Sequence, residues 1–269
     1  MPLAVKFGID FFVSFVATAI YIWFNIEERL LEENVDMNVL IDAFANEIQQ
    51  YTVVITAVSS LILLPILIRM FRQDAFKDDK CRMKWQMYPA LVLVGITASV
   101  GMNNLMTLSQ ISRVSIAYQN VAALFYQPSL LTQIIGLGLI VPIVEELLFR
   151  GVIFRRLRRE FGRKAAVGIS ALIFGLIHGN LVQFIYAFIL GALFAYLYEL
   201  LGIIWVPICL HITANLVAIM KTEHEILTWM FSSFFRVGVI TVGCAFVCSA
   251  LVVMLKNKCY ENVKKSCKK

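Results

Sequence analysis

Charged residues are scarce in this sequence. Asp, Glu, Lys and Arg make up only 16% of its 269 residues, whereas 60% of the residues are hydrophobic. Soluble globular domains carry about 25% charged residues, so this composition excludes an ordinary soluble enzyme. A single basic face is also lacking, because the Lys and Arg clusters flank apolar runs. A nucleic-acid partner is therefore not expected.

Several sequence patterns of known chemistry are absent as well. The six cysteines do not suggest a disulfide framework, since three of them lie inside apolar segments, where a free cysteine behaves as a small hydrophobic residue. A Gly-x-Ser-x-Gly motif is missing, which argues against a serine nucleophile. The chain has no internal repeat, which argues against a proton-coupled transporter built from repeated halves.

What the sequence does contain is eight apolar segments, each close to the length of a membrane-spanning helix. Backbone polar groups in lipid must be satisfied within the segment itself, which leaves the helix as the expected structure. We therefore predict an all-α fold, a polytopic membrane helix bundle of about eight transmembrane helices forming one multi-pass domain over residues 1–269. The segments are 3–26, 51–70, 88–108, 129–157, 164–178, 181–200, 203–220 and 237–255.

The positive charges predict the orientation of this bundle. Segments 69–84, 150–164 and 256–269 hold 19 of the 24 Lys and Arg residues, and even numbers of predicted spans separate them. The acidic stretch 27–47 falls on the other side. The positive-inside rule then places both termini and all three clusters in the cytoplasm, against the anionic lipids of the cell membrane.

A few polar residues interrupt the apolar segments. Ionisable groups at membrane depth cost several kcal/mol unless they are paired or hydrated, so such residues are candidates for function. His224 is not one of these residues, because it lies in a polar loop and is interpreted as solvated. The candidates are Glu145, Glu146, Arg150, His178, His211 and Asn215.

The spacing of these residues predicts which of them share a helix face. Glu146 and Arg150 are four residues apart, as are His211 and Asn215. We expect the first two to form an ion pair and the second two to point into one cleft. Glu145 points about 100° away from Glu146 and stays available for another task.

Counting from the basic turn at residues 161–162 predicts their depth. Glu146 lies 16 residues before Gly162 and His178 lies 16 after it, so the two meet at one level in an antiparallel helix pair. His211 counts as shallower by the same arithmetic. The uncharged turn 200–207 would close that difference if it lies inside the membrane.

Close helix packing is predicted for the segment that precedes this turn. Ala187, Gly191 and Ala195 recur at every fourth residue and place small side chains on one face. Such stripes let membrane helices approach closely.

Two carboxylates, two imidazoles and an amide permit amide hydrolysis without a covalent intermediate. A carboxylate can take a proton from water while an imidazole orients that water. A second imidazole and an amide can donate hydrogen bonds to a developing oxyanion. Alternatively, Glu145, His178 and His211 could hold zinc and leave one position open for water. A buried polar network that only fixes helix packing is the structural alternative.

Three motifs in order carry a family resemblance. They stand here as Glu145-Glu146-Leu-Leu-Phe-Arg150, Phe174-Gly-Leu-Ile-His178 and His211-Ile-Thr-Ala-Asn215. With them the chain resembles the CAAX prenyl protease and bacteriocin-processing family of intramembrane endopeptidases, also called the Abi family. The resemblance covers residues 129–220, which we expect to be the catalytic core.

This resemblance implies an intramembrane endopeptidase and a role for each residue. Glu145 is expected to be the general base that activates water, assisted by His178. His211 and Asn215 are expected to stabilise the oxyanion. The ion pair of Glu146 and Arg150 is expected to support them. The alternative is a non-catalytic membrane binding or immunity protein that retains the fold, although no residue of the motifs is missing.

The cofactor and the substrate are predicted less closely. We expect no metal, because the His-x-x-x-His spacing common in helix-borne zinc sites is absent; zinc on the ligands given above is the alternative. The expected substrate is a membrane-associated peptide or lipidated protein, either prenylated or secreted. Eukaryotic members open to the cytosol, whereas the charge count here opens the site to the external side. This favours the peptide-processing and immunity-associated bacterial branch.

Overall fold

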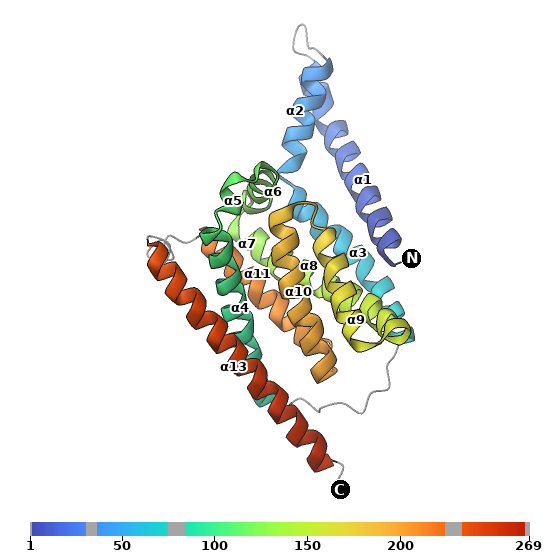
Figure 1. Cartoon of the computed structure of the whole chain (residues 1–269). Coiled ribbons are helices and arrows are strands. Elements are labelled where there is room, and N and C mark those ends of the chain that lie inside the picture. The colour runs from blue at the N-terminus through green and yellow to red at the C-terminus, as the bar shows by residue number, and fades with distance from the viewer. Residues whose placement is uncertain (1, 31–36, 75–83, 224–232, 267–269) are drawn as a thin grey trace.

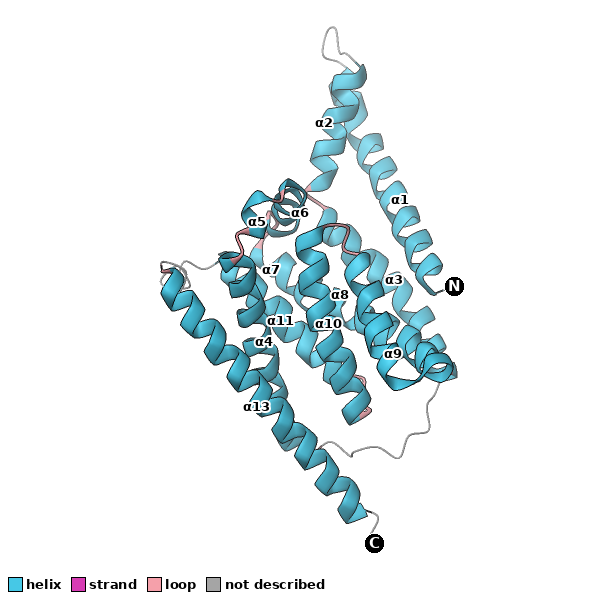
Figure 2. Ribbon diagram, in the orientation of Figure 1, coloured by secondary structure: helices cyan, strands magenta, loops and turns pink. Residues whose placement is uncertain are grey.

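The computed structural model describes residues 2–30, 37–74, 84–223 and 233–266 and consists of helices joined by loops (Figures 1 and 2). No β-strand occurs in these described ranges. The predicted all-α membrane bundle is therefore confirmed. His224, which the sequence places in a solvated loop, lies outside the described residues.

The helices follow one another along the chain with few long connections. The N-terminal half contains α1 (Pro2–Leu30), α2 (Met37–Gln49), α3 (Thr52–Gln73), the short 3₁₀-helix η1 (Trp85–Met87), α4 (Tyr88–Leu108), α5 (Ile111–Val114) and α6 (Ile116–Tyr126). The C-terminal half contains α7 (Leu130–Gln133), the π-helix η2 (Ile134–Ile140), α8 (Val141–Glu146), the π-helix η3 (Leu147–Phe154), α9 (Arg155–Leu176), α10 (Leu181–Leu201), α11 (Trp205–Glu223) and α13 (Phe234–Ser266).

Six helices of the described chain are long and apolar enough to cross a membrane. They are Pro2–Glu27, Thr52–Gln73, Trp85–Leu108, Leu181–Leu201, Trp205–Thr222 and Phe234–Asn262. The predicted spans 129–157 and 164–178 are also helical but are not among these six candidate membrane spans. The first is divided among short α- and π-helical pieces, and the second follows the arginine-rich first turns of α9. The total of eight spans thus stays a prediction.

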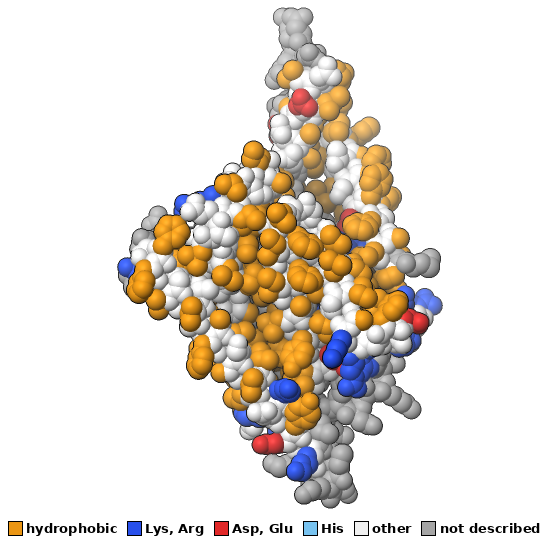
Figure 3. All heavy atoms as spheres, viewed as in Figure 1, with side chains coloured by type: hydrophobic (Ala, Val, Ile, Leu, Met, Phe, Trp, Pro, Cys, Tyr) orange, Lys and Arg blue, Asp and Glu red, His pale blue; other side chains and the backbone are white. Residues whose placement is uncertain are grey.

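The helices differ in how much of their apolar surface the protein itself covers. In α10, Phe194 is only 1% exposed, whereas Phe246 of α13 is 75% exposed and Phe12 of α1 is 65% exposed. Large apolar side chains are likewise spread over the molecular face in Figure 3. Such exposed apolar surface suits a lipid environment. α10 is therefore central in the bundle, while α1 and α13 are peripheral.

A glycine turn creates the antiparallel pair that carries the site. Gly162 has φ 77° and ψ 179° and interrupts α9 at the position where the sequence predicts a turn. Residues with a side chain rarely adopt this φ, which favours glycine there. After the turn, α9 packs along η3, and the rings of Phe149 and Phe174 lie with their centroids 4.9 Å apart.

Contacts between helix ends gather the basic segments at one end of the bundle. Arg156 pairs with Asp74 after α3 at 2.7 Å, and Arg158 pairs with Glu199 near the end of α10 at 2.7 Å. The sulfur of Cys259 in α13 lies 3.5 Å from a carbonyl oxygen at the same end of α10. Basic side chains gather near these ends of α9 and α13 in Figure 3. The described parts of the three basic clusters thus lie at one end of the helix bundle. The side of the membrane that this end faces remains a prediction.

Asp74 is an acidic partner of two arginines at this end. Its carboxylate oxygens accept hydrogen bonds from Arg156 at 2.7 Å and Arg159 at 2.5 Å. Burial raises the pKa of the carboxyl, but the hydrogen bonds and positive charges of both arginines lower it more, so the pKa lies below its ordinary value. The stabilisation is therefore present above the ordinary pKa and is lost as the pH falls through the lowered pKa.

We predict that Asp74→Asn lowers the free energy of unfolding by about 1 kcal/mol at neutral pH, because two arginines lose a charged acceptor. The apparent melting temperature of the purified protein in detergent should fall by about 2–4 °C. The acid-side decline in that melting temperature should also become shallower. Asp42→Asn, which changes an exposed residue of α2, is the control. An unchanged melting temperature in Asp74→Asn would show that the arginines find other partners.

Candidate active site

Irregular helix geometry surrounds the two glutamates. Glu145 and Glu146 end α8, a short α-helix between the π-helices η2 and η3. A π-helix has wider turns than an α-helix and occurs often at functional sites. Arg150 follows in η3, and the predicted i, i+4 ion pair with Glu146 is confirmed.

The ion pair lies completely inside the protein. Glu146 and Arg150 are both 0% exposed, and their Oε1 and Nη1 atoms are 2.9 Å apart. The Nη2 of Arg150 donates a second hydrogen bond, to the carbonyl oxygen of Gly191 at 2.9 Å. The guanidinium carbon also lies 4.6 Å from the ring centroid of Phe174. The pair thus connects the glutamate helix to α10 and α9.

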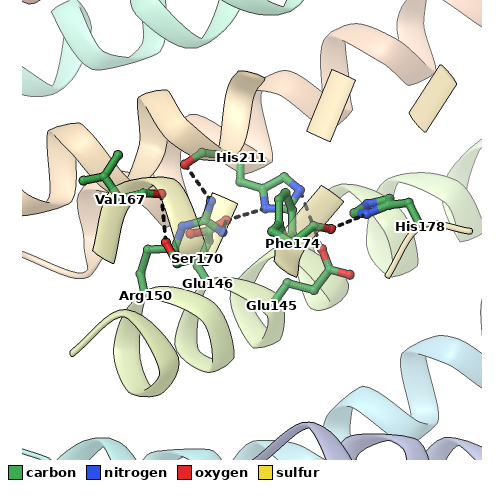
Figure 4. Close-up of polar contacts among 9 residues, drawn as sticks. Glu145, Glu146, Arg150, Val167, Ser170, Phe174, His178 and His211 are labelled. Carbon is green, nitrogen blue, oxygen red and sulfur yellow. Dashed lines mark hydrogen bonds and ion pairs between the residues drawn. The ribbon is translucent and has the colours of Figure 1, made fainter. Parts of the chain in front are cut away.

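Glu146 also orients His211. Its Oε1 lies 2.8 Å from Nδ1 of His211 (Figure 4). A carboxylate beside an arginine accepts hydrogen bonds, so Nδ1 of His211 carries the hydrogen and donates it. The opposite ring nitrogen, Nε2, lies 3.8 Å from Oε2 of Glu145. His211 therefore reaches both glutamates, and the shallower depth counted from the sequence is corrected: the chain around the turn 200–207 brings α11 to their level.

His178 is held by its own helix. It lies two residues beyond the end of α9 at Leu176, and its Nδ1 lies 2.8 Å from the carbonyl oxygen of Phe174. A carbonyl oxygen only accepts, so Nδ1 donates, and in the neutral imidazole Nε2 then carries a lone pair. The buried ring of Phe174 meets His178 edge to face at 5.0 Å and His211 at 5.7 Å. The phenylalanine of this motif thus separates and orients both imidazoles.

Asn215 forms a hydrogen bond to the π-helix η2, at a position where the backbone hydrogen bonding of that helix is interrupted. Val141 donates its N–H to Gly136, and Pro142 has no N–H. These two residues are the main-chain donors that would otherwise reach the carbonyl oxygen of Leu137. The Nδ2 of Asn215 donates to that oxygen instead, at 2.8 Å. This role of Pro142 is not among the predictions from the sequence, although a proline five residues after Leu137 is the pattern that could have indicated it.

A cavity of about 250 Å³ joins the predicted catalytic residues. Glu145, His178, His211 and Asn215 all line it. Residues of α5, α6 and the C-terminal part of α4 line it as well. These elements lie at the other end of the bundle from the basic segments (Figure 1). The structure thus brings the four predicted catalytic residues to one cavity, while Glu146 and Arg150 lie behind it; their catalytic roles remain predictions.

The zinc alternative requires three ligand side chains placed around one point. Among the described residues, no three His, Cys, Asp or Glu side chains are placed so that they could hold a metal ion. Glu145, His178 and His211 line the same cavity but do not form such a ligand set in this arrangement. No step through zinc is therefore derived for this site.

Gly191 makes the close approach of α10 to the ion pair possible. A Cβ at this position would lie 2.9 Å from Cδ1 of Phe174 and 3.0 Å from Nη2 of Arg150. The small-residue stripe containing Gly191 therefore serves close packing, as predicted. Here that packing holds the arginine itself.

We predict that Gly191→Ala lowers the free energy of unfolding by about 1–3 kcal/mol, because Arg150 and Phe174 must move. The measurement is the apparent melting temperature of the purified protein in detergent. Gly168→Ala is the matched control, since its Cβ would meet nothing within 4 Å on the helix α9. Equal melting temperatures for the two variants would contradict the predicted clash.

Comparisons with known proteins agree with these motifs. Residues 127–217 match the model of the family described as type II CAAX prenyl endopeptidase Rce1-like. The protein named "Putative membrane peptidase YdiL" of Bacillus subtilis (strain 168) is 38% identical over 91 residues, which are 34% of this chain and 37% of that protein. The chain thus covers little more than a third of this relative. No solved structure matches the chain significantly. The family resemblance is confirmed, and the matched segment contains all three motifs.

Proposed function

Because residues 127–217 match the type II CAAX prenyl endopeptidases, we propose that this chain is an intramembrane endopeptidase that hydrolyses a peptide bond with water activated by Glu145. The observation that carries the proposal is the cavity where Glu145 meets His178, His211 and Asn215 inside an apolar helix bundle. A cavity of this kind allows water and a peptide to meet away from bulk solvent.

Glu145 and His178 handle the water. The side chain of Glu145 is 16% exposed and lines the cavity, so its carboxylate is accessible to water there. His178 donates from Nδ1 to the carbonyl oxygen of Phe174, and in the neutral imidazole the lone pair on Nε2 accepts a hydrogen bond from the same water. Glu145 then takes the proton as the hydroxide oxygen attacks the carbonyl carbon of the substrate.

His211 and Asn215 stabilise the oxygen that becomes negative in this step. His211 donates from Nδ1 to Glu146, so donation from Nε2 requires the imidazolium form. Asn215 uses one amide hydrogen on Leu137 and keeps a second for the oxyanion.

Collapse of the tetrahedral intermediate completes the reaction. The C–N bond breaks, and the proton held by Glu145 passes to the leaving nitrogen, so that the two products are a carboxylic acid and an amine. No covalent enzyme intermediate forms. Glu146 and Arg150 take no part in the proton transfers and act by holding His211 and α10 in place.

The substrate class follows from the end at which the cavity lies. The cavity is at the end opposite to the basic segments, which the positive-inside rule assigns to the cytoplasm, against anionic lipids. The site then faces the external side of a bacterial cell membrane, and both termini are cytoplasmic. We propose a secreted or membrane-associated peptide, with or without a prenyl group, as the substrate.

We predict that Glu145→Gln abolishes the proteolysis, because the swap keeps the shape of the side chain but removes the base. The termini of peptides in native cells that carry the wild type or the variant can be compared by mass spectrometry. Termini that depend on the enzyme should decrease by about 100-fold or more. Glu160→Gln, at an exposed position of α9, should leave them unchanged. Identical termini in all strains, with the phenotype intact, would instead favour the non-catalytic binding or immunity protein.

We predict that turnover of the identified substrate survives exhaustive chelation. The expected result is an unchanged rate after treatment with EDTA and 1,10-phenanthroline, because the proposed base is a carboxylate. Metal analysis of the purified protein accompanies the assay. Stoichiometric zinc together with a rate that falls on chelation would establish the zinc alternative on Glu145, His178 and His211.

A further inference from the structure

The turn between α9 and α10 brings a polar side chain to the cavity that the proposed hydrolysis does not use. This side chain is Gln183, in the first turn of α10, and it lines the cavity together with His178. Gly179 between them has φ 75°, a value that residues with a side chain rarely adopt. The chain therefore turns within a few residues, and the end of α9 and the beginning of α10 face the same space.

The first turn of α10 is packed closely against α9. A Cβ on Gly175 of α9 would lie 3.0 Å from the carbonyl oxygen of Phe184 and 3.2 Å from Cβ of Phe188, so the two helices approach each other closely at this point. Gln183 directly precedes Phe184 in the chain. The backbone of Gln183 is therefore fixed relative to the helix that leads to His178.

Asn180 determines which way the amide of Gln183 points. The Oδ1 of Asn180 accepts a hydrogen bond from the backbone N–H of Gln183 at 3.0 Å, as is usual for a residue that caps a helix. Because this oxygen is the acceptor, the other amide atom of Asn180 is the donor Nδ2. It donates to Oε1 of Gln183 at 2.6 Å and lies 3.5 Å from the carbonyl oxygen of His178. The oxygen of the Gln183 amide thus faces Asn180, and its nitrogen faces away.

The nitrogen of the Gln183 amide is available to a ligand. Nε2 carries two hydrogens, and within the described chain it makes no hydrogen bond. The cap of α10 uses the oxygen of this side chain and its backbone N–H, so capping does not account for the nitrogen. Gln183 is half-buried and lines the cavity. A neutral donor in this place suits a neutral acceptor that enters the cavity.

A peptide substrate carries such acceptors in its main chain. Each of its residues has a carbonyl oxygen, and moving this group from water to apolar surroundings is costly unless a donor meets it. In the proposed hydrolysis His178 binds the attacking water, and Asn180 joins His178 to Gln183. A carbonyl oxygen held by Gln183 therefore lies near the bond that the water attacks.

We propose that Gln183, oriented by Asn180, binds a main-chain carbonyl oxygen of the peptide substrate beside the bond that is cut. This contact rests on the proposed endopeptidase function. It holds the substrate backbone and accepts any side chain at that substrate residue. Gln183 takes no part in the proton transfers, and Asn180 acts only by positioning the amide of Gln183.

The first test is the kinetics of Gln183→Met, which removes the donor without adding a charge. The probe is a synthetic peptide that spans the cleavage site identified from the Glu145-dependent termini, and the protein is assayed in detergent. KM should rise about three- to tenfold, because one hydrogen bond to the substrate is lost. The value of kcat should change by less than about twofold, since this bond is present both before and during the reaction. A fall in kcat at constant KM overturns the proposal, because it assigns Gln183 to the support of His178.

A second variant withdraws the donor while Gln183 itself stays. Asn180→Asp keeps the oxygen that caps α10 but replaces the donor by a second oxygen. The amide of Gln183 should then turn and donate its nitrogen to the carboxylate, so KM should rise as in Gln183→Met. Gln127→Met, at an exposed position after α6, is the control and should leave both constants unchanged. Unchanged KM in both Asn180→Asp and Gln183→Met overturns the proposal.

Thioamide peptides test the other partner of the hydrogen bond with the wild-type protein, independently of how the variants fold. The probe carries one thioamide at a time along its length, since sulfur accepts hydrogen bonds more weakly than oxygen. One position near the cleavage site should raise KM of the wild type by about threefold or more and leave KM of Gln183→Met unchanged, as expected for two groups in contact. The absence of such a position overturns the main-chain contact.

The order of the measurements separates this inference from the proposed function. Glu145-dependent termini together with the expected changes in KM support both. Glu145-dependent termini without those changes support the protease and overturn the contact with Gln183. The absence of Glu145-dependent termini rejects the protease, and with it the contact that depends on it.

Discussion

The buried ion pair between Glu146 and Arg150 is the interaction on which the site depends. Both side chains are fully enclosed, and one oxygen of Glu146 accepts hydrogen bonds from Arg150 and His211. Arg150 reaches further, to the carbonyl oxygen of Gly191 and the face of Phe174. An unpaired charge would cost several kcal/mol in such surroundings. The ion pair and its three partners, His211, Gly191 and Phe174, are therefore held together strongly, and with them the helices that lead to both histidines.

A second constraint comes from the backbone of the helix before the glutamates. Pro142 provides no N–H, and the π-helical turn directs the N–H of Val141 to Gly136. The carbonyl oxygen of Leu137 becomes an acceptor for Asn215 of a distant helix. A carbonyl released inside an apolar bundle needs a hydrogen-bond donor, and the amide of Asn215 supplies one. An irregularity in one helix thus fixes the position of an amide on another.

The bundle separates its charges along its length. Arginines of α9 meet Asp74 and Glu199 at one end, whereas the cavity lies toward α5 and α6 at the other. Peripheral helices such as α1 and α13 expose apolar side chains along the middle. This arrangement fits a protein anchored at its basic end, with its cavity reached from the opposite end or from the lipid.

The helical membrane fold, the turn at Gly162 and the polar residues that meet at the cavity can all be predicted from the sequence. These follow from local causes: apolar length, the conformational freedom of glycine, and the cost of charge in lipid. Three contacts become visible only in the folded chain. Glu146 orients His211, the carbonyl oxygen of Leu137 accepts a hydrogen bond from Asn215, and Lys221 lines the same cavity as Glu145. These contacts join helices far apart in the chain, and π-helical turns shift their register. Spacing within a single helix therefore could not predict them.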